Sequence, residues 1–266
     1  MFDELTVICG RDKSGSDEKV REFSIKKSEI YSIVGFTGSG KSQLIQDIEL
    51  LSQGDGLSCR SVLVDGKIPD AAMRYDPRKK IIAHLSQNMN FMVDMKVFDF
   101  LEIHSKCRMK SGHVQNDIRD HINRIVYTAN QLTGESIKPD DKLTRLSGGQ
   151  SRALMIADVA INGNAPIVLI DEIENAGINR LKAMEILASE GKIVLIVTHD
   201  PVLALIAKKR VVMKNGGIEA VITTSEKEKK ILEELKVITE RMLVIQSDLR
   251  NGEQLSFGKR MKEVAV

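Results

Sequence analysis

The segment 35–42 combines residue types and a spacing that suit the binding of phosphate groups. It fits the pattern G-x-x-x-x-G-K-S at every specified position, with the residues Gly35, Phe36, Thr37, Gly38, Ser39, Gly40, Lys41 and Ser42. Glycines let the backbone wrap closely around phosphates, and a helix N-terminus adds inward N–H groups and a positive dipole end. Lys41 would neutralise the β- and γ-phosphates, and the Ser42 hydroxyl would bind Mg²⁺. The segment therefore predicts a site for ATP or GTP.

The residues on both sides of this segment predict the elements that would position it. Residues 30–34 form a short apolar run that suits a buried strand. After the segment, Leu44, Ile45 and Ile48 fall on one face of a helix. Strand, glycine loop and helix thus follow in the order that the motif requires, which argues against a glycine-rich turn that matches the pattern by chance.

Acidic side chains and an imidazole follow two further apolar runs. Residues 167–170 are typical of a fully buried strand, which ends in Asp171 and Glu172. Residues 193–197 predict another buried strand, and His199 follows it. Open α/β sheets bind ligands at the carboxyl ends of their parallel strands, so the acidic pair is a candidate binding site. A solvated acidic pair is the alternative, and the four aliphatic residues before it argue against that.

Composition limits what can surround these residues. The chain has 266 residues with 42% hydrophobic content, enough for one core plus a small subdomain but too few for two full nucleotide-binding domains. The net charge of +2 gives no reason to expect a nucleic acid as partner. Cys9, Cys59 and Cys107 lack C-x-x-C spacing, and no apolar run has the length of a membrane span. We therefore expect a reducing, cytoplasmic compartment.

The remaining apolar patterns predict strands in the first third and last fifth of the chain, with helices between them. The predicted strands are 5–9, 20–25, 61–64, 81–85, 211–213 and 218–222, and the predicted helical segments are 97–104, 113–132 and a run through Ala160. The first two strands form a hairpin ahead of the phosphate-binding loop. The helical stretch suggests a subdomain inserted between two strand-rich parts.

Five motifs in this order resemble the ATP-binding cassette (ABC) ATPases, from about residue 2 to 222. They are the loop 35–42, Gln87, the segment 146–150 (LSGGQ), the acidic strand end 167–172 and His199. The resemblance implies a P-loop NTPase fold of the α/β class, with a mixed sheet core, an antiparallel β region and a helical subdomain. A C-terminal helical extension, the least family-like part, follows this domain. We expect an ABC ATPase domain at 1–224, with the helical subdomain at about 88–145, and the extension at 225–266.

The resemblance also assigns roles in the binding and hydrolysis of Mg-ATP. ATP would contact residues 35–42 together with Ser147, Gly148, Gly149 and Gln150. Mg²⁺ would be held by Ser42, Gln87 and Asp171, since a hard cation prefers oxygen ligands. Glu172 would act as general base on the attacking water, and His199 would hold that water and the γ-phosphate. Gln87 would contact Mg²⁺ or the water and report occupancy to the helical subdomain.

In this family the LSGGQ segment closes over the γ-phosphate bound by a second chain. We therefore expect a head-to-tail homodimer, or a pair with another ABC ATPase subunit, in which ATP binding drives dimerisation and hydrolysis releases it. The hydroxyl of Ser147 and the N–H of Gly149 suit this contact, and the helix that begins near Gln150 adds its dipole.

The chain departs from the usual family pattern in three places. Residues 10–16 contain no aromatic residue to stack on adenine, so either Arg11 takes that place or the base is held weakly. Residues 173–177 replace the usual D-loop sequence, so either Glu174 or Asn175 acts across the dimer or the coupling between the two chains differs. The interval from Glu172 to His199 is also short, which predicts a trimmed helix at 178–189.

The segment 226–250 has a heptad pattern. Its apolar residues alternate four and three positions apart, namely Ile231, Leu235, Ile238, Met242, Ile245 and Leu249. Either this helix docks on its own cassette, which the short length favours, or it self-associates or binds a partner.

Two hypotheses describe what ATP hydrolysis would drive. The favoured one is the nucleotide-binding subunit of an ABC transporter, which contacts membrane permease subunits near residues 98–101 and lies at the inner face of the membrane through them. The alternative is a non-transport ABC ATPase that assembles or energises another protein complex, which the missing aromatic and the heptad segment favour.

Overall fold

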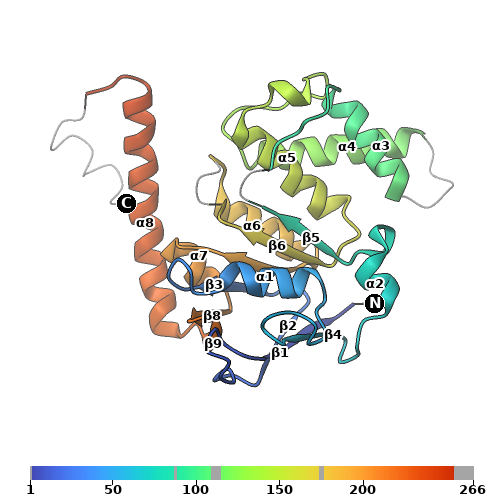
Figure 1. Ribbon diagram of the computed structural model, residues 1–266. Coiled ribbons are helices and arrows are strands. Elements are labelled where there is room, and N and C mark those ends of the chain that lie inside the picture. Colours follow the sequence, from blue (N-terminus) through green and yellow to red (C-terminus); the bar gives the residue numbers. More distant parts are fainter. Residues whose placement is uncertain (1, 87–88, 109–114, 174–176, 255–266) are drawn as a thin grey trace. The chain divides into compact units, whose positions relative to one another are not determined.

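The structure is a computed structural model that describes residues 2–86, 89–108, 115–173 and 177–254. The chain divides into two compact units, of which the first extends to Thr223 and the second begins at Thr224 (Figure 1). All of the motif residues belong to the first unit.

A six-stranded sheet forms the centre of the described part of the first unit. Its strand order is β5 (Ile82–Leu85), β6 (Ile167–Asp171), β7 (Ile193–Val197), β3 (Ile30–Val34), β8 (Lys209–Lys214) and β9 (Gly217–Thr223). Only β9 runs antiparallel to its neighbour among these six. The five residues of β7 are all buried, as expected for a parallel strand that is covered on both faces.

Each face of this sheet has its own hydrophobic core. Alternate residues of β6 and β7 point to opposite sides, so that Val168 and Ile170 join one core while Ile167 and Leu169 join the other. The first core contains side chains of α3 (Val97–Arg108), α4 (Gln115–Asn130), α5 (Gly148–Ile161) and α6 (Arg180–Ser189). The helical region therefore packs on β6, which ends at the acidic pair, and on β7, which ends shortly before His199.

The second core joins the phosphate-loop helix to a small antiparallel sheet. That sheet has the order β2 (Glu22–Lys26), β1 (Glu4–Ile8) and β4 (Ser61–Val64). Helix α1 (Lys41–Glu49) buries Leu44, Ile45 and Ile48 in this core, together with residues of both sheets. The predicted hairpin and the predicted helix face are thus confirmed.

Short helical elements complete the first unit. They are α2 (Ala71–Tyr75), α7 (Pro201–Ile206) and the 3-10 turns η1 (Pro77–Lys79) and η2 (Leu143–Arg145). Two predicted boundaries need correction. Helix α5 begins at Gly148 rather than near Gln150, because Ser147 takes the N-cap position, and α6 begins at Arg180, because Asn179 caps it.

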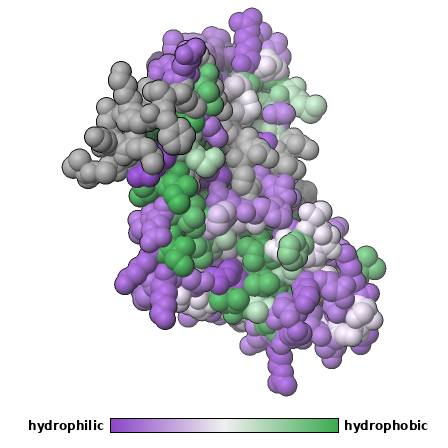
Figure 2. All heavy atoms as spheres, turned by 90° about the vertical axis from the view of Figure 1, so that its left-hand side faces the viewer, coloured by the Kyte–Doolittle hydropathy of each residue, from purple (hydrophilic) through white to green (hydrophobic). Residues whose placement is uncertain are grey.

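The second unit contains α8 (Glu226–Arg250), whose bounds equal those of the predicted heptad segment. Five of the heptad residues are exposed by 44–57%, namely Ile231, Ile238, Met242, Ile245 and Leu249. The space-filling view shows green apolar atoms between purple polar ones (Figure 2). Both hypotheses for this helix, that it docks on its own cassette or that it self-associates or binds a partner, stay predictions.

Among the helices in the described ranges, no segment combines the length and the apolar character that a membrane span needs.

Candidate nucleotide-binding site

The strand order places the predicted site segments in a row along one edge of the central sheet. Strands β6, β7 and β3 are parallel neighbours, so the residues after them share the carboxyl edge. Asp171 ends β6, His199 follows β7, and the loop 35–42 follows β3. Residues more than 130 positions apart in sequence are thereby brought to one ligand-binding edge.

The phosphate loop packs directly on the turn between β8 and β9. Gly40 has a φ of 100° and is the N-cap of α1, and a Cβ atom there would lie 2.7 Å from the Gly216 Cα atom. The Gly216 N–H donates a hydrogen bond to the Ser39 carbonyl oxygen at 2.8 Å. A side chain at position 40 would therefore displace either the loop or the turn.

Lys41 is a buried cation that faces the inside of the loop. Its side chain donates from Nζ to the carbonyl oxygens of Gly35 at 2.8 Å and Phe36 at 3.2 Å. The residue is only 8% exposed, and no described carboxylate pairs with it. A buried ammonium without an acidic partner is costly unless an anion binds to it.

Two further features of the loop fit a triphosphate. The Ser39 hydroxyl oxygen is buried without a hydrogen-bond partner among the described residues. Helix α1 has no side-chain cap and no acidic residue in its first turn, so its first N–H groups can donate to an external anion. Ser42 is exposed next to Lys41, as a magnesium-binding hydroxyl must be. These residues therefore fit ATP with its metal ion.

Glu172 and His199 lie close together at the ends of adjacent strands. The Glu172 Oε1 and His199 Nε2 atoms are 3.6 Å apart. Glu172 has a φ of 47°, an uncommon and strained conformation for a residue with a side chain, and strain of this kind clusters at functional sites. Its N–H donates to the Val197 carbonyl oxygen at 3.2 Å, which ties the end of β6 to β7. The geometry suits a carboxylate that a histidine orients.

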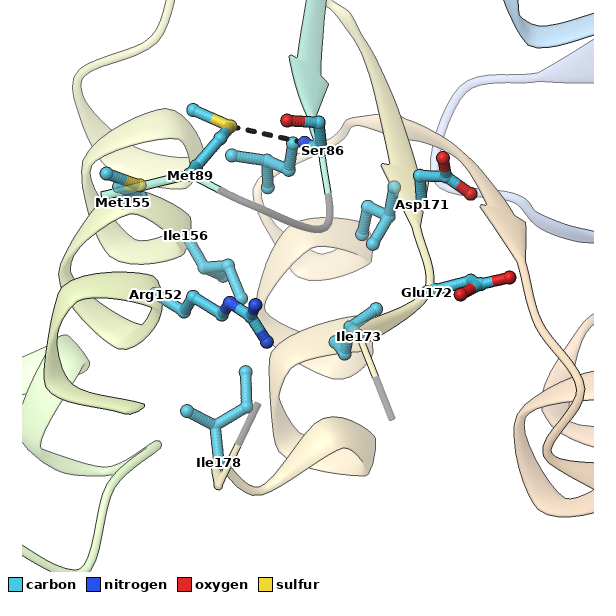
Figure 3. A pocket seen from close by; sticks show the side chains of 11 residues that line it. Ser86, Met89, Arg152, Met155, Ile156, Asp171, Glu172, Ile173 and Ile178 are labelled. Carbon is cyan, nitrogen blue, oxygen red and sulfur yellow. Dashed lines mark hydrogen bonds between the residues drawn. The ribbon is translucent and has the colours of Figure 1, made fainter. Parts of the chain in front are cut away.

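An apolar pocket lies behind the acidic pair. Its lining includes Met155 and Ile156 of α5 together with Ile173 and Ile178. Figure 3 shows the Asp171 and Glu172 carboxylates turned away from these α5 side chains. The lining is mostly apolar, with Arg152 of α5 as its one basic residue, so it offers phosphate groups fewer donors than the loop 35–42 does.

The LSGGQ segment is built as a self-contained helix start. Ser147 Oγ accepts from the Gln150 N–H at 3.2 Å, and the Ser147 N–H donates to Gln150 Oε1 at 2.9 Å. This reciprocal pair is a capping box. Ser147 and Gly148 are exposed, and a Cβ atom at Gly148 would meet nothing within 4 Å. Because the cap uses the hydroxyl oxygen as acceptor, the Ser147 hydroxyl proton can still be donated to a phosphate.

Some predicted positions lie outside the described residues. Gln87 is one of them, and Glu174 and Asn175 are others. Arg11, the proposed substitute for an adenine-stacking aromatic, is exposed, and its Nε atom lies 3.9 Å from the Oδ1 atom of Asp17. Beside it, Lys13 Nζ donates to the Gly38 carbonyl oxygen at 2.7 Å, so the turn 10–16 contacts the phosphate loop.

Sequence reasoning missed an ion pair next to His199. Arg180 at the start of α6 pairs with Asp200, which also caps α7 by accepting from the Val202 N–H at 2.8 Å. The pair therefore connects the start of α6, which follows Glu172 in the chain, with Asp200, the residue directly after His199. A capping aspartate before Pro201 is the one local signal that could have indicated Asp200.

Sequence reasoning also missed a buried cluster of charges beneath the phosphate loop. The side chains of Arg60 and Glu18 are 0% exposed and that of Asp47 is 2% exposed. Burial alone would lower the pKa of the Arg60 guanidinium, but hydrogen bonds and charges from the two carboxylates raise it above its ordinary value. Burial, followed by the charge of Glu18, raises the pKa of the Cys9 thiol to about 12.

Comparisons with known proteins point to one family. The ABC transporter family model matches residues 19–175. An uncharacterized ABC transporter ATP-binding protein of Methanocaldococcus jannaschii is 53% identical over 253 residues, which is 95% of each chain. A macrolide export ATP-binding/permease protein of Bradyrhizobium diazoefficiens is 28% identical over 80% of this chain, and the match spans only 33% of that longer protein.

Two solved structures share the fold. The cbiO1 protein of Clostridium perfringens, part of an ABC transporter complex, has a TM-score of 0.62 at 21% identity and covers 91% of this chain and 96% of its own. A dimeric ATP-binding cassette bound to ADP and phosphate has a TM-score of 0.61 at 22% identity, with 83% of this chain and 99% of its own covered.

Proposed function

Because the chain belongs to the ABC transporter family of ATP-binding proteins, we propose that it binds Mg-ATP at residues 35–42 and hydrolyses it. The observation that carries this proposal is the approach of Glu172 to His199, 3.6 Å apart, at the same sheet edge as the loop. A carboxylate and an imidazole at that place can activate water next to a bound γ-phosphate.

Each residue has a task in this proposal that follows from its position. Lys41 exchanges its two carbonyl partners for phosphate oxygens, and the first N–H groups of α1 donate to the same group. Ser42 and Asp171 would hold Mg²⁺, which would neutralise charge on the phosphates. Glu172 takes the proton of the attacking water, and His199 keeps that carboxylate and the water in place. Gln87 would add a ligand to the metal or the water.

We propose that the complete site needs two chains. Ser147 and Gly148 are exposed and Gly149 and Gln150 are half-buried at the start of α5, so a second molecule can approach this helix start. A second chain in head-to-tail orientation would place this helix start over the γ-phosphate. A cassette of the same fold whose structure is described as dimeric, with ADP and phosphate bound, supports the pairing of two chains.

Family membership favours the transporter role over the non-transport alternative. We propose that the chain is the ATP-binding subunit of a transporter, cytoplasmic or held at the membrane by permease subunits. Relatives named for macrolide export and methionine import do not fix the cargo, because they are under 30% identical to this chain. Co-purification tests the role: a polytopic membrane protein as partner supports it, whereas a purely non-membrane complex contradicts it.

The substitution Glu172→Gln tests the catalytic part of the proposal. It removes the base but keeps size and hydrogen bonding, so we expect turnover to fall by about 100-fold or more while ATP stays bound and dimers accumulate. Steady-state hydrolysis and size-exclusion chromatography with Mg-ATP measure both effects. Glu190→Gln, at the C-cap of α6, is the matched control and should keep wild-type turnover, because it weakens only a solvent-accessible ion pair with Arg124. Unchanged turnover in Glu172→Gln would exclude this carboxylate as the base.

A further inference from the structure

The buried cluster beneath the phosphate loop connects four separate segments through one guanidinium. Arg60 donates from Nη1 to Asp47 Oδ2 at 2.8 Å and from Nη2 to Glu18 Oε1 at 2.6 Å. Its Nε donates to Glu18 Oε2 at 3.2 Å, so the contact with Glu18 is bidentate. Nη2 also donates to the Gly216 carbonyl oxygen at 2.8 Å. The planar fork of arginine thus contacts helix α1, the turn 10–18 and the β8–β9 turn at once.

The two carboxylates extend these contacts to the backbone and to neighbouring side chains. Glu18 accepts hydrogen bonds from the N–H groups of Gly10 and Ile218, each at 2.6 Å. Asp47 accepts from the Ser58 hydroxyl at 2.7 Å and from the Gln43 amide at 2.9 Å. All of the charges in the cluster therefore have partners, which a buried group of this kind requires.

Each segment that Arg60 contacts also touches the phosphate loop. Asp47 is on α1, whose first residue is Lys41. Gly216 donates to the Ser39 carbonyl oxygen and packs against Gly40. Lys13, in the turn that Glu18 ends, donates to Gly38. The loop is consequently held from three sides by elements that meet at one buried arginine.

We propose that Arg60 is a positioning residue that sets the phosphate loop in its nucleotide-binding conformation. This inference rests on the proposed function, because the loop must bind a nucleotide for its position to matter. Arg60 is too deeply buried to touch the nucleotide itself. It acts through the backbone of Gly216 and through α1, so its effect falls on binding more than on the chemistry at Glu172.

Arg60→Lys is the most informative substitution. Lysine keeps the positive charge between the two carboxylates but cannot contact Glu18, Asp47 and Gly216 together. We expect the Kd for Mg-ATP and the KM to rise by about tenfold, while kcat at saturating ATP changes by less than about threefold. Without nucleotide, amide hydrogen exchange in residues 35–42 and 215–217 should become about tenfold faster.

Lys192→Met is the matched control. Lys192 is also buried, donates to the carbonyl oxygens of Gly163 and Ala165, and lies before β7 at the opposite end of the strands. Its loss should lower the melting temperature without changing exchange in residues 35–42 or the Kd for Mg-ATP. A merely structural role for Arg60 would give this same result, so the contrast between the two variants separates positioning from stability.

The inference fails if folded Arg60→Lys has wild-type exchange in the loop and wild-type affinity. If that variant does not fold, the combined variant Glu18→Gln, Asp47→Asn, Arg60→Met removes all buried charges, and the same measurements apply to it. Wild-type protein also tests the inference without any variant. Mg-ATP should slow amide hydrogen exchange in residues 10–18 and 58–60 as well as in residues 35–42. Protection confined to 35–42 would overturn the inference. If wild-type protein does not bind Mg-ATP, the proposed function fails. The role of Arg60 in positioning the loop is still tested in that case, by amide hydrogen exchange without nucleotide.

Discussion

Two helices of the first unit begin at glycine-containing segments, and their N-termini are constructed in opposite ways. Helix α1 has no side-chain cap, and its loop is enclosed by the turn 10–16 and the β8–β9 turn. Helix α5 carries its own capping box and is exposed at Ser147 and Gly148. The first leaves its N–H groups for a ligand that binds the loop of its own chain, whereas the second is capped by its own side chains and exposed to a second molecule.

This difference explains why one chain would supply only half of a catalytic site. An uncapped helix start with a buried lysine is unsatisfied until an anion binds, so the loop is expected to bind ATP in a single chain. A capped and exposed helix start needs nothing from its own chain and suits contact with a second molecule. Predictions that act on one helix start and spare the other can therefore break or sharpen the comparison.

The largest effect is expected from Lys41→Ala. Loss of a buried, charge-assisted contact to phosphate corresponds to about 1.5–3 kcal/mol, or about 10- to 100-fold weaker binding of Mg-ATP. Turnover should disappear with it, because the γ-phosphate loses its counter-charge. Isothermal titration with Mg-ATP measures the affinity. Affinity unchanged from wild type would show that the loop is not the nucleotide site.

Ser147→Arg should lower turnover without changing nucleotide affinity, and the loss of the N-cap should also cost about 1 kcal/mol of stability. A long cation at the exposed start of α5 would prevent close approach of a partner's nucleotide and remove one donor, which we expect to lower turnover by about 100-fold. The affinity of the single chain for Mg-ATP should change by less than about twofold, because position 147 is not in the loop. Equilibrium binding at low protein concentration, compared with hydrolysis at high concentration, measures the two quantities. Full turnover would contradict a role for this segment.

The smallest effect is expected from Gln150→Ala, which breaks one half of the capping box. Loss of a cap contact typically costs about 1 kcal/mol or less of stability. We expect a small decrease in the urea midpoint, with unchanged affinity for Mg-ATP. A decrease in affinity would mean that the two helix starts are coupled within one chain, contrary to the comparison above.

Local patterns predicted much of this structure. The motif 35–42 is contiguous, and the strands β6 and β7 read as uninterrupted aliphatic runs. Helix α8 follows from a regular spacing of apolar residues. The fold class and the row of segments at the carboxyl edge followed from these patterns together with the family resemblance.

The features that sequence reasoning missed depend on contacts between distant residues. Glu18, Asp47 and Arg60 have no characteristic spacing, and their charges read as ordinary surface residues until the fold buries them. The pair of Arg180 and Asp200 likewise joins two loops that meet only because β6 and β7 are neighbours. The left-handed backbone of Glu172 also has no sequence signal, since glutamate rarely adopts it.

A mixing experiment tests the central claim, that each site is shared between two chains, most directly. Lys41→Ala and Ser147→Arg are each measured for Mg-ATP hydrolysis alone and then after mixing in equal amounts. The mixed dimer has one site with an intact loop from the Ser147→Arg chain and an intact LSGGQ segment from the Lys41→Ala chain, so hydrolysis should reappear. Wild-type hydrolysis by Ser147→Arg alone, or no gain on mixing, would contradict a shared site.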